Sequence, residues 1–144
     1  MADRVGVLHH GRLEQVDTPE RVYHRPATRF VAEFVGAATF VPGCVAEGTI
    51  VAEVGAFRYD GDLPEGSKVS LMIRPDDVTF TQNGERDAVI VAREFRGTET
   101  RYTVALASGL RVPSDQPSWT VTPVGARVGI DVRLQHVVVF PDAT

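Results

Sequence analysis

Alternating apolar and polar positions dominate the chain after residue 36. Residues 68–74 and 127–133 both place an apolar side chain at every second position. A period of two puts these side chains on one face of a β-strand. Turn signals such as Glu47-Gly48 and Ser108-Gly109 separate the alternating runs. The pattern therefore predicts short strands joined by tight turns, in an antiparallel all-β architecture.

One stretch of the chain occurs twice. Residues 64–80, PEGSKVSLMIRPDDVTF, align without a gap with residues 123–139, PVGARVGIDVRLQHVVV. Arg74 and Arg133 are at equivalent positions, at the ends of the two alternating runs. Two copies are too few for a solenoid, which needs about three. The duplication therefore predicts two related halves of one closed β structure, either a small barrel or a pair of packed barrels.

The region between the two copies predicts further strands and one loop. The longest strand is expected over residues 87–96, followed by a turn at Gly97 and a strand over 101–107. Residues 113–124 hold three prolines and the only tryptophan. Proline cannot donate to a sheet, so this segment is expected to be a loop, with Trp119 filling a gap in the core.

The Asp76-Asp77 pair follows the first copy's strand. Pro75 is expected to end the strand, and the two carboxylates are expected to accept hydrogen bonds from the amides that follow, in a tight turn.

The first 36 residues differ in pattern and predict a hairpin followed by two short helices. The hairpin turns at His10-Gly11. Thr18 is suited to cap the first helix, with a proline directly after it, and Arg25-Pro26 ends that helix. A second helix begins near residue 28, carries an apolar stripe and ends at Gly36. We expect no separate core here, since a two-stranded ribbon is marginally stable alone.

Composition narrows the function classes. The 15.7 kDa chain has a net charge of -4 and is 43% hydrophobic, which suits one globular domain with an appended segment. An acidic β domain is a poor match for nucleic acid. Lys68 is the only lysine and lies outside any Gly-Lys pair, so no P-loop is present. No signal peptide and no apolar run of about 18 residues occurs, so we expect a cytoplasmic location without membrane insertion.

Several residues offer alternatives to a purely structural role. His9 and His10 are adjacent on a strand and so point to opposite faces, which disfavours a shared metal site. Asp76, Asp77, Glu85 and Asp87 lack the ligand spacing of a calcium loop, and a solvated acidic face is favoured. Cys44 is alone, which excludes an internal disulfide, and it is interpreted as a packed thiol.

Residues 2–36 carry a specific family resemblance. Their sequence, ADRVGVLHHGRLEQVDTPERVYHRPATRFVAEFVG, resembles the end of the ATP-binding domain of an ABC importer, most of all the polyamine and ferric iron type. The shared pattern comprises Ala2, Asp3, Arg4, Gly11, Gln15, Thr18, Pro19, Tyr23, Pro26, Phe30, Val31, Ala32, Phe34 and Gly36. The rest resembles the TOBE domain of these subunits, which has an OB-like fold. Its hydrophobic strand followed by Arg-Pro-Glu is matched at residues 73–76, with Asp76 in place of Glu, while Thr39 replaces a usual Asn.

The resemblance implies a fold and a division of the chain. The fold class is mainly β: an OB-like (TOBE) antiparallel barrel with an internal duplication, preceded by a short hairpin and two short helices. Residues 1–36 would be the remnant of the ATP-binding domain, and residues 37–144 the regulatory TOBE domain.

The parent protein would hydrolyse ATP with Mg²⁺. This chain has no Walker A, signature loop, Walker B or switch histidine, so we expect no catalytic residue, cofactor or metal site in it. The implied partners are a second copy of the chain, the ATPase body and the transmembrane permease subunits. The implied location is the cytoplasmic face of the inner membrane.

Two groups of residues are candidate contact sites. Arg74, Pro75, Asp76, Arg133 and Gly97 form the first group, as family-motif positions or interface and ligand contacts. Arg74 and Arg133 could hold an anion or a partner's carboxylate, or could pair internally with Asp76, Asp77 or Asp131, and the nearby carboxylates favour internal pairing. The second group is the apolar stripe of Phe30, Val31, Phe34 and Val35, for which the alternatives are the ATPase body, a second copy and strand exchange.

The function that follows is a regulatory and dimerising domain of an ABC importer ATP-binding subunit. The alternative is a small-oxyanion binding barrel, similar to the molybdate-binding barrels. A single-strand nucleic-acid binder is disfavoured by the acidity and by the lack of an aromatic pair on one strand face.

Overall fold

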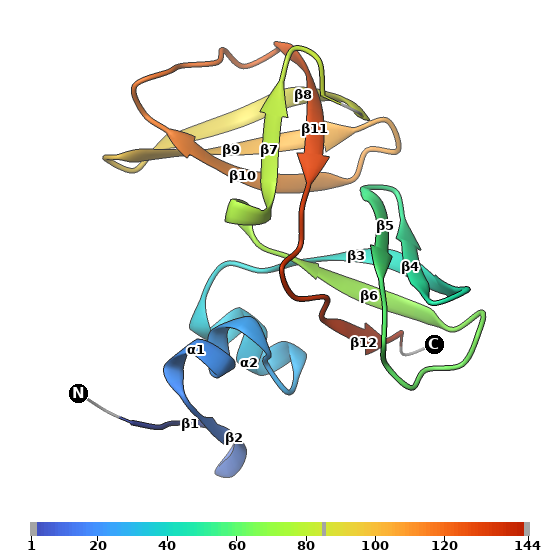
Figure 1. The fold of residues 1–144 in the computed structure, drawn as a ribbon. Helices are drawn as coiled ribbons and strands as arrows, with labels where there is room; N and C mark the ends of the chain where they lie inside the picture. Colours follow the sequence, from blue (N-terminus) through green and yellow to red (C-terminus); the bar gives the residue numbers. More distant parts are fainter. Residues whose placement is uncertain (1–2, 85, 143–144) are drawn as a thin grey trace.

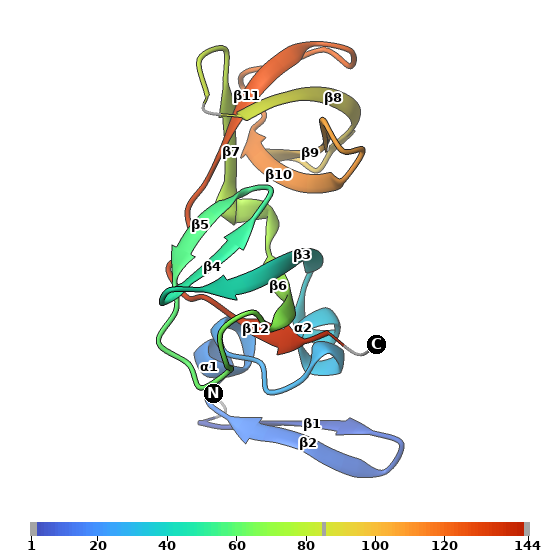
Figure 2. The ribbon, with the colours of Figure 1, turned by 90° about the vertical axis from the view of Figure 1, so that its right-hand side faces the viewer.

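Two five-stranded antiparallel sheets make up most of the molecule. The structure, a computed structural model, describes residues 3–84 and 86–142. The lower sheet in Figure 1 consists of β3 (Thr39–Ala46), β4 (Thr49–Ala52), β5 (Gly55–Arg58), β6 (Lys68–Ile73) and β12 (Val139–Pro141). The upper sheet consists of β7 (Val78–Thr81), β8 (Arg86–Phe95), β9 (Glu99–Leu106), β10 (Arg111–Pro117) and β11 (Arg127–Val132). Figure 2 shows the two sheets stacked, with the helices and the N-terminal hairpin beneath the lower one.

The duplication in the sequence appears as a duplication in the sheets. Strands β6 and β11 are separated by the same 59 positions as the two sequence copies. The strand orders β12-β6-β3-β4-β5 and β7-β11-β8-β9-β10 are equivalent position by position. Both predictions, an antiparallel OB-like β fold and two related halves, are confirmed.

The two halves exchange their last strands. From β6 the chain passes through the short 3-10 helix η1 (Pro75–Asp77) into β7, which pairs with β11 in the upper sheet. From β11 it passes through residues 133–138 into β12, which pairs with β6 in the lower sheet. Each sheet therefore contains one strand from the other half, and the two connections cross between the sheets.

One core joins the two sheets. Side chains such as Val41, Leu71, Val104 and Ile130 are fully buried and belong to a single apolar cluster. The upper sheet closes on itself because its two edge strands are bonded by a side chain: Ser114 Oγ on β10 donates to the Val78 carbonyl on β7 at 2.6 Å.

Strand β6 is buried on both faces. Val69, Leu71 and Ile73 point into the core, as their alternation predicts. Met72, on the opposite face, packs with Ala32 of the second helix and Val138 of the second connection. The N-terminal segment therefore covers the outer face of the lower sheet.

The N-terminal elements match their predictions. Strands β1 (Val5–His9) and β2 (Arg12–Asp17) form the hairpin, and helices α1 (Pro19–His24) and α2 (Arg29–Val35) follow. Thr18 and Thr28 cap the two helices, each hydroxyl accepting an amide hydrogen bond. The expectation that this segment has no core was wrong, because Val7, Val22 and Val31 form a small buried cluster of their own.

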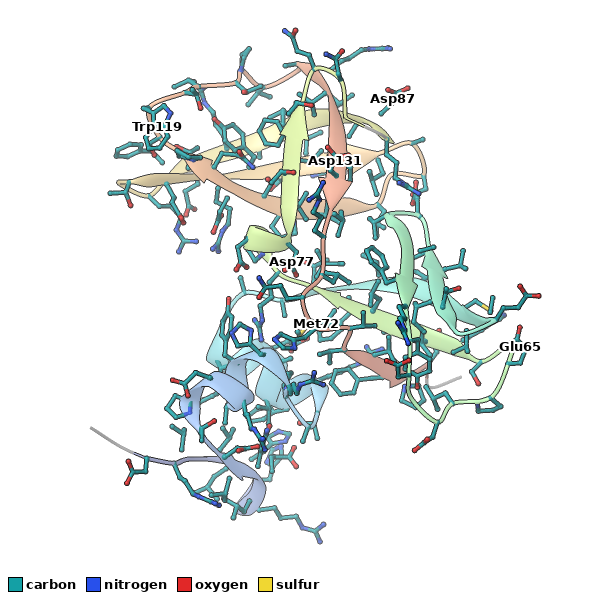
Figure 3. The ribbon with its side chains drawn as sticks, viewed as in Figure 1. Glu65, Met72, Asp77, Asp87, Trp119 and Asp131 are labelled. Atoms are coloured by element: carbon teal, nitrogen blue, oxygen red, sulfur yellow. The ribbon has the colours of Figure 1, made fainter. Side chains whose placement is uncertain are left out.

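The prediction of a loop at residues 113–124 was wrong for its first part. Strand β10 continues to Pro117, because it is an edge strand and the missing N–H groups of Pro113 and Pro117 interrupt no inner ladder. The placement of Trp119 was also wrong. Its side chain fills no gap and is 84% exposed, and Figure 3 shows it at the outer end of the upper sheet.

None of the helices formed by the described residues has the length and apolar character that crossing a bilayer requires.

Candidate functional site: the junction around Arg74

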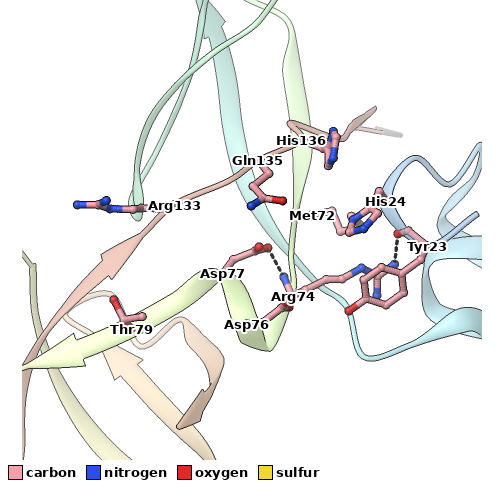
Figure 4. Close-up of a pocket in the computed structure, with 10 residues that line it drawn as sticks. All are labelled: Tyr23, His24, Met72, Arg74, Asp76, Asp77, Thr79, Arg133, Gln135 and His136. Atoms are coloured by element: carbon pink, nitrogen blue, oxygen red, sulfur yellow. Dashed lines mark hydrogen bonds between the residues drawn. The ribbon is translucent and has the colours of Figure 1, made fainter. Parts of the chain in front are cut away.

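Arg74 is buried where the N-terminal helices meet the β domain. Its side chain leaves the end of β6 and is 3% exposed. Nη1 donates to the Ala37 carbonyl at 2.9 Å, and Nη2 donates to the carbonyls of Tyr23 at 3.0 Å and Ala32 at 3.4 Å. The guanidinium also lies 4.1 Å from the centre of the Tyr23 ring (Figure 4). One side chain of the β domain thus binds α1, α2 and the segment that follows α2.

The partners of Arg74 explain why a charge is tolerated there. The last carbonyls of a helix have no partner within the helix and carry partial negative charge. Arg74 satisfies such groups on α1 and α2 with a planar fork of donors. Burial lowers the pKa of the guanidinium, while Tyr23, Asp77 and Asp76 act in the opposite direction. Its Nε has no hydrogen-bond partner among the described residues.

Asp77 fixes the backbone from which Arg74 projects. Its Oδ2 accepts the Arg74 backbone N–H at 2.8 Å. The expected bonds to following amides are replaced by this bond to a preceding one, because residues 75–77 form a turn of 3-10 helix whose first N–H groups need an acceptor. Burial raises the pKa of Asp77 to about 6, and the hydrogen bond from Arg74 opposes that increase.

A cavity of about 310 Å³ opens beside Arg74. Its walls come from α1, β6, the first connection, β7 and the second connection. They are Tyr23, His24, Met72, Arg74, Asp76, Asp77, Thr79, Arg133, Gln135 and His136 (Figure 4). The His24 and His136 rings are 5.0 Å apart. Burial lowers the pKa of His136, and the positive charges of Arg25 and His24 lower it further. His136 Nδ1 has no partner among the described residues.

The structure separates the first group of predicted contact residues. Arg74 and Arg133 are not equivalent: Arg74 is buried, whereas Arg133 is exposed and uses its backbone N–H to bind the Asp77 carbonyl at 3.0 Å. Arg74 is held internally, as favoured, but the guanidinium binds backbone carbonyls where carboxylates were expected. Pro75 is buried and Asp76 is exposed beside it.

Gly97 lies far from this group. It forms the turn between β8 and β9 with φ 89°, and so belongs to the outer end of the upper sheet.

The predicted apolar stripe of α2 is divided among different surroundings. Val31 is fully buried in the N-terminal cluster and presents no surface to a partner, while Phe30 and Val35 pack against that cluster. Phe34 is 66% exposed. Of the four, Phe34 offers the largest open surface.

The other chemical candidates have ordinary surroundings. The His9 ring stacks on Phe30, and its Nδ1 lies 3.4 Å from Glu14. The expectation that His9 and His10 point to opposite faces of a strand was wrong, because His10 lies in the turn with φ 52° and the two rings are 4.2 Å apart. No group of three potential metal ligands occurs among the described residues. Cys44 is partly buried. Glu85 lies outside the described residues.

Sequence reasoning missed the acceptors of Arg74 and the pairing of His24 with His136. These contacts join positions more than 35 residues apart and have no local pattern. Gly36 was a usable signal. A Cβ there would lie 3.1 Å from Tyr23 Cε1 and 3.3 Å from Arg74 Nη1, so the glycine marks a close approach.

Comparison with known proteins identifies the β domain. A model of the TOBE domain matches residues 71–140, which include Arg74, β7 to β11 and both connections. Residues 71–140 form a TOBE domain. The match covers both crossing connections, so the exchange of strands lies within the TOBE domain.

Relatives that match most of the chain include ATP-binding proteins of importers. A sulfate/thiosulfate import ATP-binding protein of Xanthomonas campestris is 34% identical over 142 residues, which cover 98% of this chain and 41% of that protein. A spermidine/putrescine import ATP-binding protein of Pseudomonas fluorescens is 31% identical, over 82% of this chain and 35% of that protein. The resemblance to ABC importer subunits is confirmed, and the chain spans less than half the length of these relatives.

A solved structure shares the fold. The cytoplasmic molybdate-binding protein ModG superposes with a TM-score of 0.60 over 72% of this chain and 96% of its own, at 16% sequence identity. At this identity the match shows the fold alone, and it supports the OB-like architecture.

Proposed function

We propose that this chain is the coupling and regulatory part of an ABC importer ATP-binding subunit. The observation that carries the proposal is Arg74, through which the TOBE domain binds carbonyls of both N-terminal helices. Those helices carry the sequence pattern that ends the ATP-binding domain of importers. Movements of the ATP-binding domain would reach the TOBE domain through this contact, and a signal on the TOBE domain would return along the same path.

The proposal assigns ATP chemistry to the rest of the subunit. ATP and Mg²⁺ would bind in the ATPase body, and the chain itself would hydrolyse no ATP. The proposed partners are that body, the transmembrane permease subunits and a second copy of the chain, with the complex on the cytoplasmic face of the inner membrane. Sulfate/thiosulfate and spermidine/putrescine import ATP-binding proteins both occur among the relatives, and the proposal covers both solute classes.

A chimera tests the proposed function. Residues 1–144 would replace the matching segment of the Xanthomonas campestris protein, and sulfate uptake and ATP hydrolysis would be measured with its permease. We expect the chimera to support uptake, and Arg74→Met to lower uptake per ATP hydrolysed. The exposed equivalent Arg133→Met is the matched control. Equal uptake per ATP hydrolysed in the chimera and in its Arg74→Met and Arg133→Met variants would contradict the proposal.

The cavity beside Arg74 favours a second candidate function, the binding of a small oxyanion. His136 Nδ1 has no hydrogen-bond partner among the residues that the structure describes, and burial and the positive charges of Arg25 and His24 lower the pKa of its ring. An anion at this place would supply a hydrogen-bond partner and offset those charges. The ModG structure contains molybdate, which makes molybdate a sensible first probe.

Calorimetry with molybdate, tungstate, sulfate and phosphate tests the second candidate. Binding should weaken in His136→Phe and Arg25→Gln. It should persist in Arg96→Gln, because Arg96 follows β8 at the outer end of the upper sheet and its Nε lies 3.3 Å from Glu94 Oε1. Absence of heat for all four anions would exclude this function and leave the coupling role intact.

A further inference from the structure

The lower sheet is open at the place where the upper sheet is closed. In the upper sheet, Ser114 on the edge strand β10 bonds the Val78 carbonyl on the other edge strand, β7. The equivalent edge strands of the lower sheet are β5 and β12. Val137, which follows Val78 by 59 positions and lies just before β12, lines a cavity of about 760 Å³ together with residues of β5. One edge of the lower sheet is therefore accessible.

This cavity, which we call the β5 groove, lies between two stretches of chain. One wall is residues 56–61, from β5 and the segment after it, and the other is residues 132–137, from the end of β11 and the second connection (Figure 1). A smaller cavity of about 180 Å³ continues along β5 as far as Val54. Ligand pockets have volumes of about 300–1,000 Å³, so the groove is large enough to bind a ligand.

The edge of β5 supplies backbone hydrogen-bonding groups. The Tyr59 N–H, directly after β5, donates to the Gly48 carbonyl on the β4 side at 2.8 Å. Bonding directions alternate along a strand, so the N–H groups of Ala56 and Arg58 point away from β4. Strand β5 is the last strand of its sheet. An edge of this kind is a template to which an extended segment of another chain can add as a further strand.

The floor of the β5 groove is apolar. Phe57 and Tyr59 on one wall, and Leu134 and Val137 on the other, line the groove while packing against the core. Along β5, Phe57 is partly buried, whereas Ala56 and Arg58 on either side of it are exposed. The groove therefore has an apolar inner face and a polar outer face, as a two-faced strand requires.

The rim of the β5 groove is positively charged. Arg25, Arg58 and Arg133 line it, and among the described lining residues Asp60 alone carries a negative charge. Arg58 Nε lies 3.4 Å from Asp60 Oδ1, but the two side chains are 87% and 81% exposed, and such exposed pairs hold each other weakly. Three arginines and one aspartate give the rim a net charge of +2 on a chain whose net charge is -4.

These features together favour an extended, acidic peptide as the occupant. In a strand added to β5, successive side chains would point alternately to the floor and to the rim. Small apolar side chains suit the floor beside Phe57 and Leu134. Acidic side chains suit the rim, where they would lie across from Arg58 and Arg133, and complementary charges of this kind select a partner.

We propose that the β5 groove binds an extended acidic segment of a partner protein, which adds to β5 as a further strand of the lower sheet. Arg74 lines the neighbouring cavity, and the groove is a site additional to the Arg74 contact. The binding of this segment goes beyond the proposed coupling role and does not depend on it.

Synthetic peptides test the proposal on the full chain. The probe is a fluorescently labelled peptide of about eight residues, a usual strand length, in which Glu and Val alternate. A peptide in which Lys and Val alternate is the control. Fluorescence anisotropy should show binding of the acidic peptide, weakening as salt rises, and no binding of the basic one. Absence of binding by the acidic peptide at low salt would overturn the proposal.

Hydrogen exchange distinguishes strand addition from attraction between charges. The backbone amides of Ala56 and Arg58 should exchange more slowly when the acidic peptide is bound, because they become donors to its carbonyl groups. Unchanged exchange at both amides in the presence of saturating peptide would overturn the added strand. Tighter binding by inorganic phosphate or by a single-stranded oligonucleotide than by the acidic peptide would overturn the choice of partner.

Matched variants locate the site. Arg58→Glu should weaken binding of the acidic peptide at least about tenfold, and circular dichroism should show an unchanged fold because the side chain is exposed. Arg96→Glu makes the same change of charge after β8, where Arg96 Nε lies 3.3 Å from Glu94 Oε1, and should leave binding unchanged. Equal weakening in both variants would overturn the proposal. Uptake by the chimera is measured without the peptide, so failure here leaves the proposed function intact.

Discussion

Arg74 and Arg133 show how the same residue acquires different roles at equivalent positions of a duplication. Arg74, at the start of the first connection, binds carbonyl groups of both N-terminal helices. The second connection is open to solvent on the side from which Arg133 projects, and Figure 4 shows its side chain pointing away from Arg74. The surroundings, which are supplied by residues 1–36, decide the difference.

At the residue scale we predict that Arg74→Met destabilises the protein and Arg133→Met does not. Removing the buried guanidinium leaves three carbonyl acceptors without partners, which should lower the free energy of unfolding by about 2–4 kcal/mol. The exposed Arg133→Met should change it by less than about 0.5 kcal/mol. Urea denaturation of both variants measures the difference, and equal midpoints would contradict the role of Arg74.

Asp77 gives a prediction about pH. The pKa of Asp77 is raised to about 6 in the folded protein, from 3.8 for a free side chain, chiefly by burial. The folded state therefore holds this proton more tightly, and the resulting stability, present below pH 3.8, is lost as pH rises through about 6.

Asp77→Asn removes this titration while keeping an oxygen that can accept the Arg74 N–H. Between pH 4 and pH 7 the wild type should lose about 1–2 kcal/mol relative to the variant, less than the full shift implies because the carboxyl is partly solvated. Unfolding free energies at the two pH values test the prediction. A wild type that gains stability relative to Asp77→Asn between pH 4 and pH 7 would contradict the prediction.

At the scale of elements, local patterns determined most of what could be predicted. The alternation in β6 and β11, the cap at Thr18 and the turn at His10-Gly11 act over a few residues, and the structure has them where they were expected. The predicted strand at β10 was too short, because proline disfavours strands in general. Proline is tolerated in an edge strand, and which strand lies at the edge depends on the topology.

The site was less predictable than the fold. The motif at residues 73–76 indicated Arg74, but its acceptors belong to elements that the chain forms about 40–50 positions earlier. The cavity requires α1 and both connections at once. Such long-range combinations leave no periodicity in the sequence.

Gly36 permits a prediction about how α2 joins the β domain. Its φ of 171° is extended, and so the expected helix-ending role of glycine does not depend on a left-handed backbone. Gly36→Ala should instead force Tyr23 and Arg74 apart, with a loss of about 1–3 kcal/mol. Gly6→Ala is the control, because the nearest atom there is at an ordinary contact distance of 3.4 Å. Thermal denaturation compares the stabilities of the two variants. A melting temperature of Gly36→Ala equal to that of the wild type would show that the junction can accommodate the added Cβ.

At the scale of the whole molecule, the predicted division between residues 1–36 and 37–144 becomes testable. The two parts are packed together: the Tyr23 and Ala32 carbonyls bind Arg74, and Ala32 packs with Met72 and Val138. A chain that begins at residue 37 should therefore lose about 3 kcal/mol or more of stability, because Met72 and the guanidinium lose their cover.

A chain that begins at residue 18 is the matched control, since it lacks the hairpin but keeps both helices. It should lose less stability than the chain that begins at residue 37, because the hairpin contributes only to the separate cluster of Val7, Val22 and Val31. Urea midpoints and solubility compare the two shortened chains. Equal stability of the chain from residue 37 and the full chain would show that the TOBE domain is independent of the helices.

The exchange of last strands has a mechanical consequence. Turning one sheet against the other would require separating β7 from β11 or β12 from β6. The two sheets must therefore tilt together, as a rigid lever whose short arm is held at Arg74 and whose far end carries Trp119. A small rotation of the helices would be amplified into a larger displacement of that far end.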